Sequence, residues 1–302
     1  MDVDAKLNST SFKCGYAVII GEPNVGKSTL MNSMLDMKLS IVTAKPQTTR
    51  HRILGILTED NCQIIFLDTP GLIEPKYKLH EYMLKAVEKA IAEADVILFT
   101  IEAKSSISRN ETLLSSIIKT RTPVLLVINK VDRIEKQNLL PIIQNYKDRH
   151  SFAEIIPVSA LHCDGIDLLK SGIKKYIPYS PPLYPPDMIT ENPERFFVAE
   201  LIRENIFEMF RDEIPYSTTV IINEFKERQN SKDFISATIY VERISQKGII
   251  IGKKGSALKN LGQLARQDIE KFLERGVYLE LHVSVKENWR YKEIALRHLG
   301  YQ

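Results

Sequence analysis

Cysteines are few in this sequence, and long apolar runs are absent from it. Cys14, Cys62 and Cys163 are an odd number of cysteines at wide spacings, and no CxxC pair occurs. This pattern is typical of reduced thiols, and it argues against a disulfide framework and a structural zinc site. No apolar run reaches about 18 residues, so we expect no membrane-spanning helix. Residues 1–13 are polar, so we expect no secretory signal peptide there.

An excess of one charge sign is also nearly absent, because the formal net charge is only +3. By itself this value does not indicate a nucleic-acid-binding protein. The charge is unevenly distributed along the chain, however, since residues 243–260 contain five basic residues and no acidic one. The five are Arg243, Lys247, Lys253, Lys254 and Lys259. Such a basic region is the electrostatic footprint expected of RNA binding.

Length and composition favour a soluble globular protein of two domains, since 302 residues exceed one ordinary core and 44% are hydrophobic. In the first half, short apolar runs alternate with amphipathic stretches. This alternation predicts a doubly wound α/β domain with a mainly parallel sheet. The link 58–61 is too short for a crossover helix, so it predicts an antiparallel hairpin. We predict strands at 15–20, 53–57, 62–67, 96–101, 123–128 and 154–158.

Prolines mark the boundary between the two predicted domains. Five of the nine residues 178–186 are proline, which predicts a stiff, extended linker, with a proline-rich peptide ligand as the alternative. A helix capped by Asn192 should follow, and the last helix should begin near Trp289. The element order α-β-β-α-α-β predicts a small α+β domain. The expected division is a first domain at 1–178, a linker at 179–192 and a second domain at 193–302.

A glycine-rich loop carries the strongest functional signal. Residues 21–28 fit the pattern GxxxxGK[ST] between a predicted strand and a predicted helix at 29–35. In such a loop, backbone N–H groups and the helix N-terminus face phosphate oxygens. Lys27 is expected to reach the β- and γ-phosphates, and Ser28 to bind Mg²⁺. The predicted phosphate-binding residues are Gly21, Glu22, Pro23, Asn24, Val25, Gly26, Lys27, Ser28 and Thr29.

Three further loops, each after a predicted strand, predict a guanine nucleotide. The DTPG loop at 68–71 can hold Mg²⁺ through its aspartate and meet the γ-phosphate at its glycine N–H. In the NKVD loop, Asp132 can accept from two adjacent donors that guanine has and adenine lacks, and the SAL loop can contact guanine O6. The predicted nucleotide-binding residues here are Asp68, Thr69, Pro70, Gly71, Leu72, Asn129, Lys130, Val131, Asp132, Ser159, Ala160 and Leu161.

A polar segment at 38–50 lies between the first helix and the hairpin. A threonine in it can close over Mg²⁺ when a γ-phosphate is bound. We predict that this residue is Thr49, with Thr48 as the alternative. The predicted Mg²⁺ ligands are therefore Ser28, Thr49 and Asp68, and the predicted catalytic residues are Lys27, Thr49 and Gly71.

The second half contains a GxxG loop at 252–255, preceded by an apolar turn and followed by a predicted helix. KH domains use such a loop between two helices to clamp a nucleic-acid backbone of about four nucleotides. Trp289 and Tyr291 can stack on bases, with a core role as the alternative. The predicted RNA-binding residues are Gly248, Ile251, Gly252, Lys253, Lys254, Gly255 and Lys259.

In combination, these motifs resemble the bacterial Era family, which belongs to the TrmE-Era-EngA type of GTPases. The matching stretches span nearly the whole chain and are GEPNVGKSTL, PQTTRHR, DTPG, NKVD, SAL, RFFVAELIR at 195–203, EIPYS at 213–217, GIIIGKKG and the final LGY. The resemblance implies a Ras-like GTPase domain followed by a type II KH domain. It also implies GTP and GDP as ligands with Mg²⁺, binding to the 3′ end of 16S ribosomal RNA, and a role in maturing the 30S subunit. We expect a cytoplasmic monomer, with peripheral association at the inner face of the cell membrane as an open alternative.

Two positions bear on hydrolysis within this resemblance. Leu72 follows DTPG, where Ras-like proteins have a glutamine that orients water, so intrinsic hydrolysis is expected to be slow. Asn24 matches an asparagine that, in related GTPases, helps to hold a potassium ion in place of an arginine finger. We therefore add Asn24 to the predicted catalytic residues as a candidate potassium site and predict that K⁺ accelerates hydrolysis, with a purely loop-shaping role of Asn24 as the alternative.

Two classes of function remain at this point. In the first, GTP hydrolysis times RNA release during ribosome assembly. In the second, the nucleotide state gates docking on a protein or a membrane surface, and RNA binding is incidental. Lys253 and Lys254 in the GxxG loop favour the first class, because they supply charge where an RNA backbone would lie.

Overall fold

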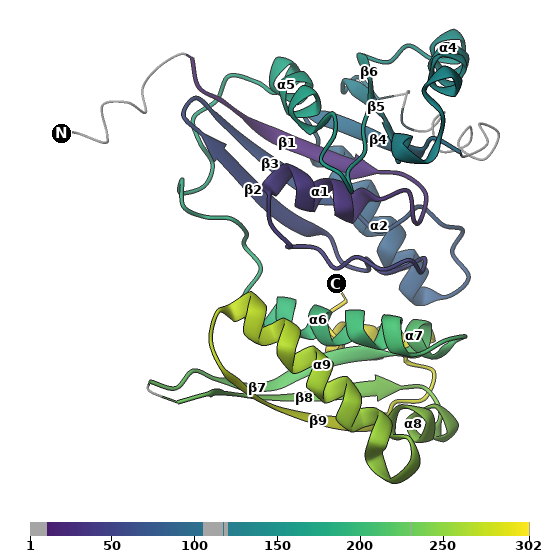
Figure 1. The fold of residues 1–302 in the computed structure, drawn as a ribbon, viewed down its shortest axis with the longest axis vertical. Coiled ribbons are helices and arrows are strands. Elements are labelled where there is room, and N and C mark those ends of the chain that lie inside the picture. The colour runs from purple at the N-terminus through teal and green to yellow at the C-terminus, as the bar shows by residue number, and fades with distance from the viewer. Residues whose placement is uncertain (1–10, 105–116, 118–119, 230, 302) are drawn as a thin grey trace. The chain divides into compact units, whose positions relative to one another are not determined.

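The computed structural model describes residues 11–104, 117, 120–229 and 231–301. Residues 1–13, in which we expect no signal peptide, lie mostly outside these ranges. Contacts divide the chain into two compact units, which Figure 1 shows. Unit 1 comprises Met1–Ser40, Thr49–Glu74 and Met83–Glu191. Unit 2 comprises Ile41–Thr48, Pro75–Tyr82 and Asn192–Gln302. In the described part of the chain, no helix is long and apolar enough to cross a membrane.

The sheet of unit 1 has the strand order β2-β3-β1-β4-β5-β6 among the described residues. Neighbouring strands are parallel except β2 and β3, which form the predicted antiparallel hairpin. The strands are β1 (Lys13–Ile20), β2 (Ile53–Glu59), β3 (Cys62–Asp68), β4 (Val96–Glu102), β5 (Val124–Asn129) and β6 (Glu154–Pro157). Every predicted strand is present, and the doubly wound α/β fold is confirmed.

Helices cover both faces of this sheet (Figure 1). On one face, α2 and α4 enclose a fully buried core of strand side chains that includes Val18, Phe99 and Leu126. On the other face, α1 packs so closely on β2 that a Cβ at Gly55 would lie 2.5 Å from Leu35. The helices are α1 (Lys27–Leu35), α2 (Lys78–Glu93), α4 (Leu139–Arg149) and α5 (Ile166–Tyr176).

The proline-rich segment is bonded along the sheet of unit 1. The N–H of Cys14 donates to the carbonyl of Pro178, and the N–H of Ile56 donates to the carbonyl of Ile189. Gln63 of β3 is fully buried. Its side chain accepts a hydrogen bond from the N–H of Leu183 and donates one to the carbonyl of Tyr184. The segment bends at Leu183–Tyr184 and turns at Pro186–Asp187, and it is held by β1, β2 and β3 as far as Glu191, where unit 1 ends.

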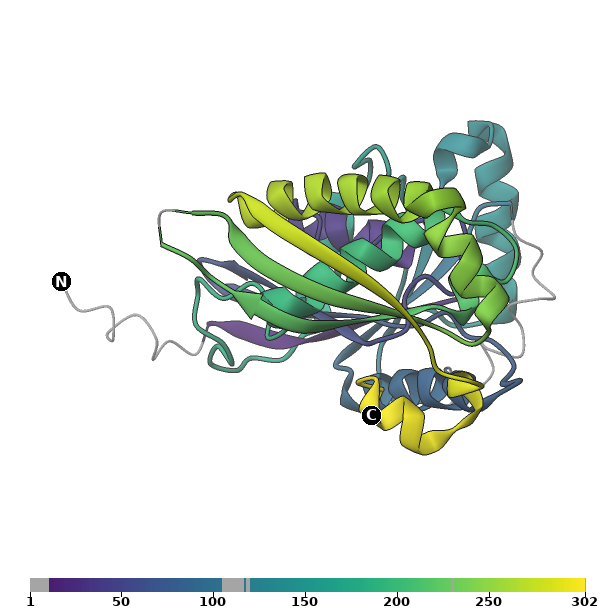
Figure 2. The same cartoon turned by 90° about the horizontal axis from the view of Figure 1, so that it is seen from below.

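Unit 2 is an α+β unit with a three-stranded sheet. The strands β7 (Thr219–Lys226) and β8 (Asp233–Val241) are antiparallel, and β9 (Val277–Val285) pairs with β8 in parallel. Apolar side chains of α6, α8 and α9 pack on one face of this sheet, and Figure 2 shows the sheet from below with α6 behind it. The helices are α6 (Glu194–Met209), α7 (Ile214–Ser217), α8 (Ile244–Ile251), α9 (Ser256–Leu273) and α10 (Glu293–His298).

Three features of the structure differ from the sequence expectations. The cap of α6 is Pro193 rather than Asn192, because the backbone enters the helix one residue later. The last helical region is a short 3₁₀ turn at Trp289–Tyr291 followed by α10, because Lys292 is extended. Two segments of the expected first domain, Ile41–Thr48 and Pro75–Tyr82, belong to unit 2.

Candidate nucleotide-binding site

The glycine-rich loop connects β1 directly to α1. Gly26 precedes the helix at φ 95°, and a Cβ there would lie 2.4 Å from the side-chain nitrogen of Asn129, so only glycine fits. The Lys27 ammonium donates to the carbonyl oxygens of Gly21 at 3.1 Å and Glu22 at 2.8 Å. The loop is therefore curled around its own lysine, as phosphate loops are.

The electrostatics of Lys27 fit an anion site. Burial lowers the pKa of its ammonium to about 8, and the nearby carboxylates of Asp68 and Glu22 oppose this shift. A buried cation with a lowered pKa is costly in isolation, and a phosphate beside it would favour the charged form. The position is therefore suited to a nucleotide's β- and γ-phosphates.

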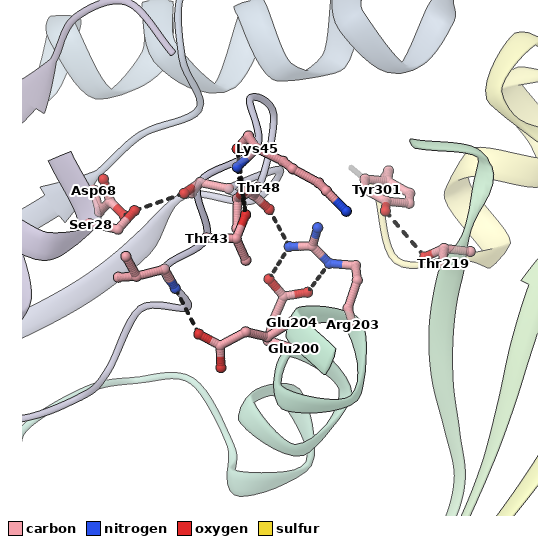
Figure 3. A network of polar contacts seen from close by, with 12 residues as sticks. Ser28, Thr43, Lys45, Thr48, Asp68, Glu200, Arg203, Glu204, Thr219 and Tyr301 are labelled. Atoms are coloured by element: carbon pink, nitrogen blue, oxygen red, sulfur yellow. Dashed lines mark hydrogen bonds and ion pairs between the residues drawn. The ribbon is translucent and has the colours of Figure 1, made fainter. Parts of the chain in front are cut away.

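Hydrogen-bonding distances join the three predicted Mg²⁺ ligands, of which Figure 3 labels Ser28 and Asp68. The Ser28 hydroxyl donates to Oδ2 of Asp68 at 2.7 Å, and Oγ of Ser28 lies 2.9 Å from Oγ1 of Thr49. Oδ1 of Asp68 is buried without a hydrogen-bond partner among the described residues. An unpartnered carboxylate oxygen beside two hydroxyls fits Mg²⁺, which prefers oxygen ligands and keeps some positions for phosphate and water.

Burial raises the pKa of the Asp68 carboxyl, and the hydrogen bond from Ser28 and the charge of Lys27 oppose this shift. A bound cation would also favour the ionised carboxylate. The alternative threonine is placed differently, because Oγ1 of Thr48 bonds to the carbonyl of Lys45 at 2.8 Å and to Oγ1 of Thr43 at 2.7 Å. The geometry therefore favours Thr49 as the metal ligand.

One buried amide joins three of the predicted loops. Asn129 donates from Nδ2 to the carbonyl of Val25 in the phosphate loop at 2.8 Å. Its Oδ1 accepts from the N–H of Lys130 at 2.8 Å and from the N–H of Ala160 at 3.1 Å. Asn129 therefore fixes the NKVD and SAL loops against the phosphate loop, a role that the sequence pattern alone does not reveal.

Asp132, the predicted hydrogen-bond acceptor for guanine, is exposed, and its carboxyl group is held in the ionised form. Asp132 accepts a 2.5 Å hydrogen bond from the Ser159 hydroxyl, which lowers the pKa of its carboxyl. The Lys130 ammonium donates to the carbonyl of Asn24 at 2.5 Å and to Oε2 of Glu102 at 2.9 Å. Glu102 is a residue that the sequence did not single out, although its place at the end of β4 matches that of Asp68 on β3.

The remaining predicted residues surround the same loops. The Thr69 hydroxyl donates to the carbonyl of Ile19 at 2.8 Å, and the N–H of Leu72 donates to the carbonyl of Gly21 at 3.2 Å. A Cβ on Gly71 would lie 2.8 Å from the Pro23 ring, so the DTPG loop passes close to the phosphate loop. Pro70 is buried and Leu161 is exposed at the outer edge of the site.

In unit 2, the GxxG loop is a tight turn between α8 and α9. Gly252 ends α8 at φ 72°, and a Cβ there would lie 2.6 Å from that of Ala257. Lys253, Lys254 and Lys259 are exposed, while Ile251 and Gly255 are half-buried and Gly248 is exposed on α8. Ile244 and Ile249 of α8 are also exposed, at 79% and 51%, and the sequence did not single them out. The loop therefore presents two cations beside apolar surface.

The two aromatic candidates near the C-terminus differ in role. Trp289 is fully buried, stacks on Tyr301 at 5.8 Å between ring centroids, and donates from Nε1 to the carbonyl of Ser217 at 2.9 Å. It is a core residue and cannot stack on bases. Tyr291 is 53% exposed and lies 5.4 Å from the ring of Tyr77 in the same unit.

Sequence comparisons identify related proteins along the whole chain. Residues 16–130 match the family model of the 50S ribosome-binding GTPases, and residues 213–290 match that of KH domains. A protein of Geobacter metallireducens, named GTPase Era, is 48% identical over 98% of this chain and 100% of its own length. A protein of Carboxydothermus hydrogenoformans with the same name is 45% identical over 96% of this chain and 98% of its own length.

Two solved structures share this architecture. A variant of Aquifex aeolicus Era bound to GDP and AlF4⁻ has a TM-score of 0.92 and 43% identity, covering 96% of this chain and 99% of its own. A structure of Era with MgGDPNP and nucleotides 1506–1542 of 16S ribosomal RNA has a TM-score of 0.92, 44% identity and the same coverage. The expected Ras-like domain with a C-terminal KH domain is confirmed by these matches.

Proposed function

Because this chain belongs to the Era family of GTPases, we propose that its nucleotide state controls binding to the 3′ end of 16S ribosomal RNA during assembly of the 30S subunit. The GTPase activity is that of the family. The relative crystallised with MgGDPNP and 16S ribosomal RNA supports the RNA target. In this chain, the observation that carries the proposal is the GxxG turn of unit 2, with Lys253 and Lys254 exposed.

The residues of unit 1 supply the parts that phosphoryl transfer needs. Lys27, which donates to the carbonyls of Gly21 and Glu22, is proposed to bind the β- and γ-phosphates. Ser28, Thr49 and Asp68 would hold Mg²⁺, which neutralises charge on the phosphates when bound. The N–H of Gly71 is proposed to contact the γ-phosphate. Leu72 cannot orient water by hydrogen bonding, which supports slow intrinsic hydrolysis.

A potassium ion near Asn24 is part of the same proposal. Asn24 is exposed in the phosphate loop at φ 65°, and its carbonyl accepts from Lys130. A monovalent cation there would supply positive charge in place of an arginine finger. We expect faster turnover in K⁺ than in Na⁺ buffer, and an Asn24→Ala variant that no longer distinguishes the two. Equal turnover in both buffers, with Asn24→Ala unchanged, contradicts this expectation.

RNA binding is tested with a single-stranded RNA oligonucleotide that carries the 3′ end of 16S ribosomal RNA. Fluorescence anisotropy is measured with a GTP analogue or GDP, over a range of salt. We expect Lys253→Ala with Lys254→Ala to weaken binding and to reduce the log–log salt slope by about 0.7 per lost phosphate contact. Lys271→Ala is the matched control, because Lys271 is an exposed lysine in the last turn of α9.

The outcome also separates the two classes of function. RNA binding that depends on the bound nucleotide supports the switch. No RNA binding under either nucleotide at moderate salt contradicts it and favours an interaction module that docks on a protein or on a membrane surface. Sedimentation with 30S subunits and with vesicles of anionic lipid then distinguishes those partners.

A further inference from the structure

Three charged side chains of α6 are buried in unit 2. The exposed fractions are 6% for Glu200, 1% for Arg203 and 3% for Glu204. Burial of charge is costly unless each group is paired and hydrogen-bonded. The helix could fold with apolar residues at these positions, so the charges require a reason other than the core of unit 2.

The partner of these charges is the segment Ile41–Thr48, which belongs to the same unit. Arg203 donates from Nε to Oε1 of Glu200 at 2.8 Å and from Nη2 to the second oxygen of Glu200 and to the carbonyl of Thr48. The N–H of Val42 donates to Oε1 of Glu204 at 2.9 Å. Figure 3 shows this ion pair and its bond to the Thr48 carbonyl.

The same segment is held at a third point, by the C-terminal end of α6. The Lys45 ammonium donates to the carbonyl oxygens of Phe207 and Phe210. Both carbonyls lie at the C-terminal end of α6, where a cation also interacts favourably with the helix dipole. α6 therefore binds the segment Ile41–Thr48 at three places, namely at Val42 near the start of the segment, at Lys45 in its middle and at Thr48 at its end.

The carbonyl that Arg203 holds lies one peptide bond from the proposed metal ligand. Thr48 is followed directly by Thr49, whose Oγ1 lies 2.9 Å from Oγ of Ser28. The peptide bond is planar, so a fixed Thr48 carbonyl also fixes the direction in which the chain enters Thr49. The bond from Arg203 to Thr48 therefore restricts the path by which the backbone reaches Thr49.

We propose that Arg203 is a positioning residue for GTP hydrolysis, which acts by holding the Thr48 carbonyl so that Thr49 faces the Mg²⁺ site. Glu200 orients the Arg203 guanidinium, and Glu204 holds the start of the same segment. The proposal rests on the GTPase activity of the family and is independent of the RNA target. It gives the stretch 195–203, which carries part of the family resemblance, a role in the nucleotide site.

The test compares variants of α6 in the full-length protein. Arg203→Met alone leaves the buried Glu200 carboxylate without the guanidinium that pairs with it, so the variant of choice is Glu200→Gln with Arg203→Met, which removes both charges. A charge-assisted hydrogen bond corresponds to about one to two factors of ten in an equilibrium constant. We expect the turnover number for GTP to fall at least about tenfold, and the Mg²⁺ concentration for half-maximal activity to rise.

Affinities for a GTP analogue and for GDP separate positioning from loss of structure. Thr49 is expected to contribute when a γ-phosphate is present, so the affinity for the analogue should fall about tenfold while that for GDP stays unchanged. A general loss of structure would instead lower both affinities and RNA binding. Circular dichroism and thermal unfolding establish that the variants are folded.

Two matched variants complete the test. Arg195→Met is the control, because Arg195 is also on α6 and donates to a backbone carbonyl, that of Ile222 in β7, at 3.0 Å. Glu204→Gln keeps an acceptor for the N–H of Val42 and should retain activity, whereas Glu204→Leu should not. An unchanged ratio of GTP-analogue to GDP affinity, with unchanged Mg²⁺ dependence, in a folded Glu200→Gln/Arg203→Met protein overturns the proposal.

Discussion

The attachment of the proline-rich segment to unit 1 depends on Gln63, and we expect Gln63→Leu to destabilise unit 1 specifically. Oε1 of Gln63 accepts from the N–H of Leu183 at 2.9 Å and of Tyr184 at 3.0 Å. Its Nε2 donates to the carbonyl of Tyr184 at 2.9 Å and to Oγ1 of Thr58 at 3.0 Å. Leucine has a similar volume but can make none of these four bonds.

The size of the effect follows from the number of bonds. Each net hydrogen bond contributes about 1 kcal/mol, and partial access of the segment to water reduces the loss. We expect a decrease of about 2–4 kcal/mol in the free energy of unfolding. For a unit of this size, that corresponds to about 5–15 °C in the unfolding midpoint.

The single tryptophan makes the assay selective. Trp289 lies in unit 2, so its fluorescence reports unfolding of that unit, while release of a fluorescent GDP analogue reports unit 1. We expect Gln63→Leu to lower the midpoint of GDP release and to leave that of Trp289 fluorescence unchanged. Thr58→Val is the control, since it removes one of the four bonds. Equal midpoints of GDP release for Gln63→Leu and Thr58→Val would refute the assigned role of Gln63.

Three further predictions concern single residues. Asp132→Asn should shift the preferred base from guanine to xanthine, because the amide N–H of asparagine can donate to the carbonyl that xanthine has in place of the exocyclic amine of guanine. Competition between the two nucleotides measures the shift. Gly252→Ala should abolish RNA binding and leave GTP hydrolysis intact, because φ is 72° and the new Cβ would meet Ala257. Trp289→Phe should destabilise unit 2 by about 1–3 kcal/mol, measured by circular dichroism, because the buried Ser217 carbonyl loses its donor.

Local sequence patterns predicted the elements and loops whose causes are themselves local. The link 58–61 predicted the β2–β3 hairpin because four residues cannot contain a crossover, and the structure confirms it. The phosphate loop lies between β1 and α1 because the same eight residues form the turn and begin the helix. Helix ends were less predictable, as Pro193 rather than Asn192 caps α6.

Contacts between distant residues could not be predicted in this way. The charges of Glu200 and Arg203 are indistinguishable in sequence from an exposed ion pair on a helix, whereas in the structure both are buried and Arg203 also bonds to the carbonyl of Thr48. The same holds for Gln63, whose partners follow it by about 120 residues. The sequence around Trp289 is compatible with base stacking and with a core role, and its contact with Tyr301 decides for the core.

The amide of Asn129 has a consequence for the kinetics of nucleotide exchange. By bonding to Val25, Lys130 and Ala160, it restricts three loops through contacts within the chain itself. The conformational entropy of those loops is lost when the chain folds, and little of it remains to be lost on binding. Association should therefore approach the speed of an encounter with a preformed pocket, and differences in affinity between guanine nucleotides should lie mainly in their dissociation rates.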